Sequence, residues 1–176
     1  PWSRSSPGTR AASPLPSPHA IAYPAAMTDR GALRIDKAKS DEAALLAELN
    51  RQLDEDEPHP YPLPLSALSE RMKRWIDNGE YEVLLFRNGD QLIGYAVWRA
   101  DEFGTYLRHF FICRDRRRQG WGRAAIQRLC RDVFPKDRPV NINATVGNKG
   151  GIAFWRAIGF QDFSLGMELK AGAAPK

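Results

Sequence analysis

The amino-acid sequence predicts one α+β domain in three layers, with about four helices packed on the faces of a mixed and mostly antiparallel sheet. Three observations support this fold class. Two amphipathic helical stretches follow a first short strand, three strands then come in succession with short turns between them, and strands alternate with helices in the last third of the chain. The expected order is β-α-α-β-β-β-α-β-α-β. A chain of 176 residues is long enough for one domain with a hydrophobic core.

The first half of the chain contains one short strand and two helical patterns. Apolar and polar residues alternate over 33–35, which predicts the strand. Ser40 is expected to cap the first helix, because two acidic residues follow it in the first turn. Leucines at helical spacing continue that helix until the prolines of residues 58–62 end it. A second helix is expected over 65–77, with Gly79 just beyond its end.

The second half is predicted from the same two periodicities. Asn88-Gly89-Asp90 is typical of the turn of a hairpin. Strands are expected over residues 81–86, 91–98, 106–113, 140–146 and 160–169, and helices over 120–133 and 152–158. The large apolar side chains expected in the core are Trp75, Trp98, Phe86, Phe134 and Phe163.

Residues 1–26 differ from the rest in composition. They contain six prolines and five serines and no acidic residue. Such a segment buries too little apolar surface to offset its chain entropy, so we interpret it as a tag, linker or upstream extension, disordered and outside a domain at 27–176. A transit peptide is the alternative interpretation. The lack of acidic residues favours a transit peptide, but so many prolines oppose the amphipathic helix that it would form.

Composition also bears on the compartment and on possible partners. The two cysteines, Cys113 and Cys130, form neither a disulfide framework nor a metal-ligand pattern, so no metal is expected and a reducing cytoplasm fits. No stretch approaches the roughly 18 apolar residues of a membrane span, so no membrane partner is expected. Residues 1–104 carry 12 basic and 16 acidic side chains, whereas residues 105–176 carry 14 and 5. This asymmetry indicates a polyanionic ligand on the second half, or else a solvated basic face.

A glycine-bearing loop between an expected strand and an expected helix carries the clearest chemistry. Its sequence is Arg117-Arg118-Gln119-Gly120-Trp121-Gly122-Arg123. The first N–H groups of a helix have no partner within it, and the helix dipole adds partial positive charge there. Two glycines let the oxygens of a ligand approach these donors, and the arginines add charge. The loop therefore predicts a phosphate or pyrophosphate site, although glycines also serve tight packing and an arginine-rich loop can contact nucleic acid.

Two motifs in this order resemble the GNAT superfamily of N-acetyltransferases. Arg117-x-x-Gly120-x-Gly122 is similar to the R/Q-x-x-G-x-G/A motif of that family, which lies between its fourth strand and third helix. The stretch from Asn148 through Gly151, Phe154 and Trp155 to Phe160 resembles the family's N-x-x-A-x-x-F-Y-x-x-x-G-F. The resemblance covers about residues 32–170, including the order of the elements.

The resemblance implies a site for acetyl-CoA. In this family the fourth and fifth strands splay apart, and the pantetheine arm of the cofactor lies in the gap. The backbone at the end of the fourth strand would pair with the pantetheine amides, the loop would bind the pyrophosphate, and Asn148 would contact the arm. The implied cofactor-binding residues are Phe111, Ile112, Cys113, Arg117, Arg118, Gln119, Gly120, Trp121, Gly122, Arg123, Asn148 and Trp155.

The catalytic residues are less clear, because this sequence departs from the family's pattern. Trp155 stands where many members have a tyrosine that protonates the leaving thiolate, so the acid is water or another residue, such as Tyr106 or Tyr61. Tyr106 also stands where the family often has a glutamate that acts as the base. His109 suits a base through its near-neutral pKa. Glu102, Asp101 and a bound water are further alternatives.

Alternation along the fourth expected strand bears on these candidates. It places Tyr106, Arg108 and Phe110 on one face of the sheet, and Leu107, His109 and Phe111 on the other. The acidic run of residues 54–57 borders the acceptor side in such folds. It either attracts an ammonium group or is a solvated turn between helices.

These observations lead to one expected function with three alternatives. We expect an acetyl-CoA-dependent N-acetyltransferase acting on a primary amine of a small molecule. A peptide or protein N-terminus is the second choice of acceptor. A module that senses acyl-CoA without turnover is an alternative, because Trp155 cannot act as an acid, and a nucleic-acid-binding domain is supported by the arginine-rich loop alone. The oligomeric state stays open, although homodimers are common in this fold.

Overall fold

The computed structural model describes residues 33–57, 62–169 and 172. The predictions for residues 1–26 and for Tyr61 lie outside these residues. The sheet has five strands in the order β1-β2-β3-β4-β5. They are β1 (Arg34–Lys37), β2 (Glu82–Asn88), β3 (Gln91–Asp101), β4 (Gly104–Ile112) and β5 (Val140–Ile142). Neighbouring strands are antiparallel except β4 and β5, which are parallel, so the expected mixed sheet is confirmed.

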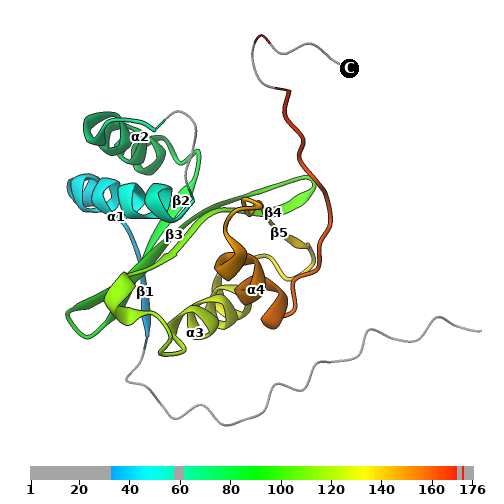
Figure 1. The fold of residues 1–176 in the computed structure, drawn as a ribbon. Helices are drawn as coiled ribbons and strands as arrows, with labels where there is room; N and C mark the ends of the chain where they lie inside the picture. The colour runs from blue at the N-terminus through cyan, green and yellow to red at the C-terminus, as the bar shows by residue number, and fades with distance from the viewer. Residues whose placement is uncertain (1–32, 58–61, 170–171, 173–176) are drawn as a thin grey trace, which may run out of the picture. The chain divides into compact units, whose positions relative to one another are not determined.

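Helices cover both faces of this sheet (Figure 1). One face carries α1 (Ala43–Asp56) and α2 (Leu65–Asn78), and the other carries α3 (Trp121–Arg128) and α4 (Lys149–Ala157). Each face has its own hydrophobic core. The core beneath α1 and α2 includes Leu46 and Met72, and the core beneath α3 includes Ala125 and Ile126. The buried side chains of these helices recur at helical spacing, as in amphipathic helices, and the three-layer arrangement is confirmed.

The ends of the helices differ in detail from the prediction. Gly79 has a φ of 68° and ends α2 as expected. Ser40, the expected cap of α1, instead begins a 3₁₀ turn (Ser40–Glu42), and its hydroxyl donates a hydrogen bond to Asp77 on α2. The Glu42 carboxylate accepts the Lys39 N–H at 2.9 Å and so takes over the capping of this turn. The helix expected over 120–133 is α-helical only to Arg128 and continues as a π-helical turn, Leu129–Val133.

A β-bulge in β4 overturns the expected alternation of its side chains. Val97 of β3 pairs with His109, but the next residue, Trp98, pairs with Leu107, so Arg108 is one extra residue in β4. The extra residue shifts the side-chain alternation by one position. Tyr106, Arg108 and His109 consequently all contact the core beneath α1 and α2. Leu107 and Phe110 face the core on the other side. The prediction that Tyr106 and His109 lie on opposite faces was therefore wrong.

Strands β4 and β5 pair over only a short stretch. Their register runs from Thr105↔Val140 to Leu107↔Ile142, while β4 continues to Ile112. The strand expected over 140–146 is thus shorter than predicted, and no other described residue forms a strand beside the remaining part of β4 at its β5 edge. This separation of the two strands agrees with the expected splayed pair.

The segment after α4 was wrongly expected to be a strand and part of the core. Residues 160–169 form neither helix nor strand, and the side chain of Phe163 is 93% exposed. Apolar alternation favours a strand only if a neighbouring strand supplies hydrogen-bond partners. Because β5 has three residues, it offers little edge for pairing. The other four aromatic residues predicted for the core are buried there.

Candidate active site

The glycine loop turns the chain from β4 into α3 through two left-handed residues. A 3₁₀ turn (Arg114–Arg116) follows β4, Arg118 has a φ of 60°, and Gly120 has a φ of 84° at the N-cap of α3. The first helical bond runs from the Ala124 N–H to the Gly120 carbonyl at 3.1 Å. The N–H groups of residues 121–123 precede this bond and therefore point away from the helix, toward its open end. Open N–H groups at a helix start can bind an anion.

Gly122 allows a close approach of α3 to α4. A Cβ added there would lie 3.2 Å from two carbons of the Phe154 ring and 3.7 Å from the Ile112 side chain. The glycine thus serves packing as well as access to the backbone. Phe154, which is part of the second sequence motif, is the side chain that a Cβ at this position would crowd.

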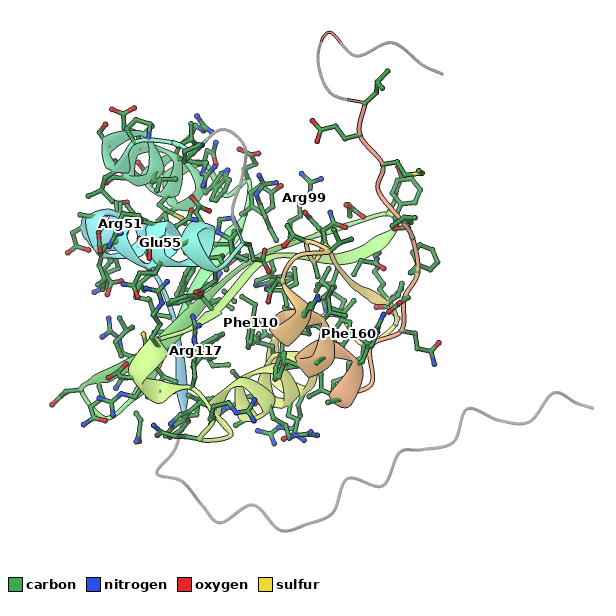
Figure 2. The ribbon with its side chains drawn as sticks, viewed as in Figure 1. Arg51, Glu55, Arg99, Phe110, Arg117 and Phe160 are labelled. Atoms are coloured by element: carbon green, nitrogen blue, oxygen red, sulfur yellow. The ribbon has the colours of Figure 1, made fainter. Side chains whose placement is uncertain are left out.

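The arginines before the helix bind the acidic end of α1. Arg117 Nε donates to the Ile112 carbonyl at 2.9 Å, and Arg117 Nη2 donates to Asp56 Oδ2 at 2.5 Å. Arg114 Nη2 lies 2.9 Å from Glu55 Oε2 and 3.1 Å from Asp56 Oδ1. Figure 2 shows Arg117 on the loop facing α1, where Glu55 lies. Asp56 and Glu55 therefore anchor α1 to the loop, and the acidic run is neither a free attractant for amines nor a simply solvated turn.

The ionisation of Asp56 reflects this pairing. Burial by itself would raise the pKa of its carboxyl, but the hydrogen bonds from Arg117 and Arg114 outweigh burial and lower the pKa. Asp56 is consequently an anion near neutral pH, and it neutralises much of the arginine charge beside the loop.

The other side chains of the loop point in different directions. Arg123 donates to the Ala157 carbonyl at 3.3 Å and so caps α4, and Gln119 donates to the Asp115 carbonyl at 2.9 Å. Trp121 is buried in the core, so its backbone N–H is the group it can present to a ligand. Arg118 is exposed beside the first turn of α3.

Asn148 caps α4 and also reaches α1. Its Oδ1 accepts the Gly151 N–H at 2.8 Å, and its Nδ2 donates to Glu57 at the end of α1. A Cβ at Gly151 would lie 2.4 Å from Asn148 Nδ2. An alanine at this position would therefore require the Asn148 amide to shift.

Backbone hydrogen bonds show which residues of β4 point their N–H and carbonyl groups toward the edge that β5 does not cover. The Cys113 N–H donates to the Ile93 carbonyl of β3 at 2.9 Å, so Cys113 and, by alternation, Phe111 point toward β3. Ile112 and Phe110 then point toward the β5 side. The backbone groups that point away from β3 are accordingly those of Ile112 and Phe110, whereas those of Phe111 and Cys113, which the sequence also predicted to meet a ligand, point toward β3. Burial raises the pKa of the Cys113 thiol and therefore disfavours its thiolate form.

Trp155 belongs to an aromatic cluster on the α4 side of the sheet. Its ring lies 5.3 Å from the Phe110 ring, 5.0 Å from the Phe154 ring and 5.0 Å from the Phe160 ring, centroid to centroid. Figure 2 shows Phe110 and Phe160 around α4. The cluster holds α4 against the part of β4 that has no β5 neighbour. Trp155 thus acts as a packing residue, and its indole N–H is too weak an acid to protonate a thiolate.

The three catalytic candidates lie in different surroundings. The Tyr106 hydroxyl accepts a hydrogen bond at 3.2 Å from Asn143, the residue after β5, and it lies where β4 and β5 separate. His109 Nδ1 lies 3.3 Å from the Tyr95 hydroxyl. Glu102 is exposed in the β3–β4 turn, seven residues before His109 along the chain. Tyr106 and His109 therefore come together on one face, and Glu102 lies apart from them.

Comparison with protein families identifies the chain. The sequence of residues 46–160 matches the model of the acetyltransferase (GNAT) family. This chain belongs to the GNAT family. Its members are acetyltransferases that use acetyl-CoA, which accords with the phosphate-binding geometry at the start of α3. No curated protein matches the sequence significantly.

Solved structures share the GNAT fold at low sequence identity. A predicted acetyltransferase from Clostridium acetobutylicum, solved with acetyl-CoA, has a TM-score of 0.62 and 18% identity over 79% of this chain and 96% of its own. A ribosomal-protein-alanine N-acetyltransferase from Brucella melitensis has a TM-score of 0.61 and 16% identity over 79% of this chain and 99% of its own. An aminoglycoside acetyltransferase from an uncultured soil metagenomic sample has a TM-score of 0.56 and 16% identity over 78% of this chain and 97% of its own.

The described residues of this GNAT protein also bear on membrane spans and metal sites. Within these residues, no helix has the length and apolar character needed to cross a bilayer. In the same part of the chain, histidine, cysteine and carboxylate side chains form no group of three or more that could hold a metal ion.

His109 makes the stability of this GNAT domain sensitive to acid. Burial, followed by the charges of Arg71 and Arg108, lowers its pKa from 6.5 to about 3. Between these values the unfolded chain takes up a proton that the folded protein does not. The free energy of unfolding therefore falls as the pH drops below 6.5, by up to about 1.4 kcal/mol per pH unit.

We expect the free energy of unfolding of wild type, measured in urea, to fall by about 2 kcal/mol more than that of His109→Phe between pH 7.5 and 5.0. Equal losses would contradict this assignment.

Proposed function

We propose that this protein is an N-acetyltransferase that transfers the acetyl group of acetyl-CoA to a primary amine of a small molecule. One observation carries the proposal. The open N–H groups at the start of α3 lie directly after the part of β4 that has no β5 neighbour. A ligand with a diphosphate at one end and an amide-bearing arm at the other would satisfy both sets of backbone groups.

The described residues fit acetyl-CoA in this orientation. The N–H groups of residues 121–123 would hold the diphosphate, with Arg118 free to turn toward a phosphate. The Ile112 N–H and the outward backbone groups of Phe110 would pair with the amides of the pantetheine arm, since the Ile112 carbonyl already accepts a hydrogen bond from Arg117. Asn148, at the N-cap of α4, would contact the arm with its amide. Arg117 contributes indirectly, because its contacts with Ile112 and Asp56 keep the loop in place.

The thioester supplies an activated acetyl carbon that a neutral amine can attack. On the protein side, the Tyr106 hydroxyl is the best-placed group to donate a proton to the departing sulfur, because it lies where β4 and β5 separate and is held by Asn143. Its hydroxyl thereby takes the role that Trp155 cannot fill. His109, with a pKa of about 3, is too weak a base to accept a proton from an ammonium group efficiently at neutral pH. The amine therefore loses its proton to water.

Two measurements test the proposal in order. Acetyl-CoA at 100 times its Kd should stabilise the folded protein by about 2.7 kcal/mol and raise the melting temperature, whereas RNA should not. A thiol-release assay with a panel of small primary amines should then show acetyl-CoA-dependent turnover. Stabilisation by acetyl-CoA without thiol release from any amine, or from a set of peptide N-termini, would mark the protein as an acyl-CoA sensor. Release with peptides alone would replace the small molecule by a peptide acceptor.

A further inference from the structure

Three arginines lie over aromatic rings on the α1/α2 face of the sheet. The Arg108 guanidinium lies 5.3 Å from the Trp75 ring and 5.5 Å from the Tyr81 ring. The Arg99 guanidinium lies 5.2 Å from the Tyr81 ring and 6.0 Å from the Tyr106 ring. The Arg71 guanidinium lies 5.1 Å from the Trp75 ring. We call this set the arginine–aromatic surface; it consists of Arg71, Arg99, Arg108, Trp75, Tyr81 and Tyr106.

The positive charge of this surface is only partly balanced. Arg71 donates to Asn50 at 2.7 Å and has Asp54 nearby, yet its Nε is buried and has no hydrogen-bond partner among the residues that the structure describes. Arg99 lies 3.8 Å from Asp101, an exposed and loose ion pair. Burial, followed by the charge of Arg108, lowers the pKa of Arg71, so two cations oppose each other here. An anion placed between them would relieve this repulsion.

The bulge in β4 directs this charge toward the expected reaction centre. Arg108 is the extra residue of the bulge, and its neighbours Tyr106 and His109 face the same side of the sheet. Tyr106 lies one residue before the last β4 residue that pairs with β5, and its hydroxyl meets Asn143, the first residue after β5. Figure 2 shows Arg99 on the side of the sheet away from α3 and α4. The arginines therefore lie on the same face of the sheet as Tyr106, with Arg99 over its ring, whereas acetyl-CoA would approach from the α3 side.

We propose that the arginine–aromatic surface binds a carboxylate of the acceptor, and that the acceptor is an amine with a carboxylate close to its nitrogen, as in a free amino acid. The inference rests on the proposed function and narrows its substrate class. Guanidinium groups match a carboxylate with two parallel hydrogen bonds. In an α-amino acid one carbon separates the carboxylate from the nitrogen, so a carboxylate held by Arg108 and Arg99 leaves the amine beside Tyr106.

The charges elsewhere on this side argue against a polycationic acceptor. The acidic residues at the end of α1, which could have attracted ammonium groups, are engaged by Arg114, Arg117 and Asn148. The cations of the arginine–aromatic surface would also repel a second ammonium group. A carboxylate would be favoured by these same charges, and an acceptor amide lacking the negative charge would lose this interaction.

Binding is measured by calorimetry on the full chain with CoA present. The probes are the free amino acids, the C-terminal amide of each one that binds, O-phosphoethanolamine and spermidine. We expect at least one amino acid to bind ten or more times more tightly than its own amide. Arg108→Gln should reduce that ratio below three, and Arg108→Lys should retain part of it. Arg34→Gln, a matched change at an exposed arginine on β1, should leave the ratio unchanged.

Several outcomes would overturn the inference. These are equal binding of acid and amide, preference for spermidine, tighter binding of phosphoethanolamine than of every amino acid, or no binding of any probe. Thiol release, measured with the same compounds, separates this inference from the proposed function. Turnover with amides or spermidine in preference to amino acids would sink the inference alone. Selective binding of amino acids without turnover of any amine would overturn the proposed function and leave carboxylate recognition standing.

Discussion

Gly122→Glu should raise the KM for acetyl-CoA about 100-fold, equivalent to about 2.7 kcal/mol of lost binding. Two effects add. A Cβ at this position meets the Phe154 ring at 3.2 Å, and the new carboxylate occupies the positive end of α3, where the diphosphate is expected. A repulsion of about 3 to 4 kcal/mol is typical of two like charges 4 to 5 Å apart near a protein surface. Steady-state kinetics and the thermal shift with acetyl-CoA both measure the loss.

Two further variants separate these effects. Gly122→Ala adds the Cβ without the charge, so it should cost less than tenfold in KM. Gly166→Glu adds the same side chain at a glycine with open space around it, and it should bind acetyl-CoA as wild type does. If Gly122→Glu and wild type gave the same thermal shift with acetyl-CoA, the assignment of the diphosphate to α3 would be wrong.

Tyr106→Phe should lower kcat about 100-fold, while the KM for acetyl-CoA changes by less than threefold. The change removes one hydroxyl and keeps the ring, so the core beneath α1 and α2 stays packed. General acids in enzymes typically contribute factors of about 10² to 10⁴. Thiol release at saturating acetyl-CoA measures the effect, and melting curves establish that the variant folds.

Asn143→Ala provides the companion measurement. The Asn143 side-chain amide donates to the Tyr106 hydroxyl at 3.2 Å and so positions it. Loss of this amide should lower kcat about tenfold, which is less than the loss of the hydroxyl itself. In the Tyr106→Phe background, Asn143→Ala should lower kcat little further. A Tyr106→Phe enzyme with full kcat would rule out the hydroxyl as the proton donor and leave water in that role.

Local pattern was sufficient for most of the fold. The two helices on one face and the β2–β3 hairpin have strong periodicity and specific stop residues, and Gly79 and Gly89 both adopt the left-handed conformation that those stops require. Residues 160–169 show the limit of this reasoning. Their apolar alternation is as regular as that of a real strand, yet a strand depends on a partner edge that no local pattern describes.

The site was predictable where it depends on a helix terminus and not where it depends on distant pairs. Gly120 at the N-cap of α3 follows from the motif. The contacts of Arg117 with Asp56 and of Asn148 with Glu57 join residues 61 and 91 positions apart, and nothing in either stretch indicates the other. The shared face of Tyr106 and His109 depends on one unpaired residue, which periodicity cannot detect because it assumes an unbroken strand.

The bulge at Arg108 also bears on which changes of chain length the protein tolerates. A strand with one extra residue has its two halves out of phase, and each half is matched to a different set of neighbours. Deleting Arg108 would remove the extra residue, so Leu107 and His109 would pair with consecutive residues of β3 and the other side chains of β4 would keep their faces. Deleting Phe110 instead would shift the residues after it by one position, and would turn Phe111 toward the core beneath α3 and Ile112 toward the core beneath α1 and α2. The domain should therefore tolerate the loss of one residue at the bulge but not in the regular part of β4 that follows it.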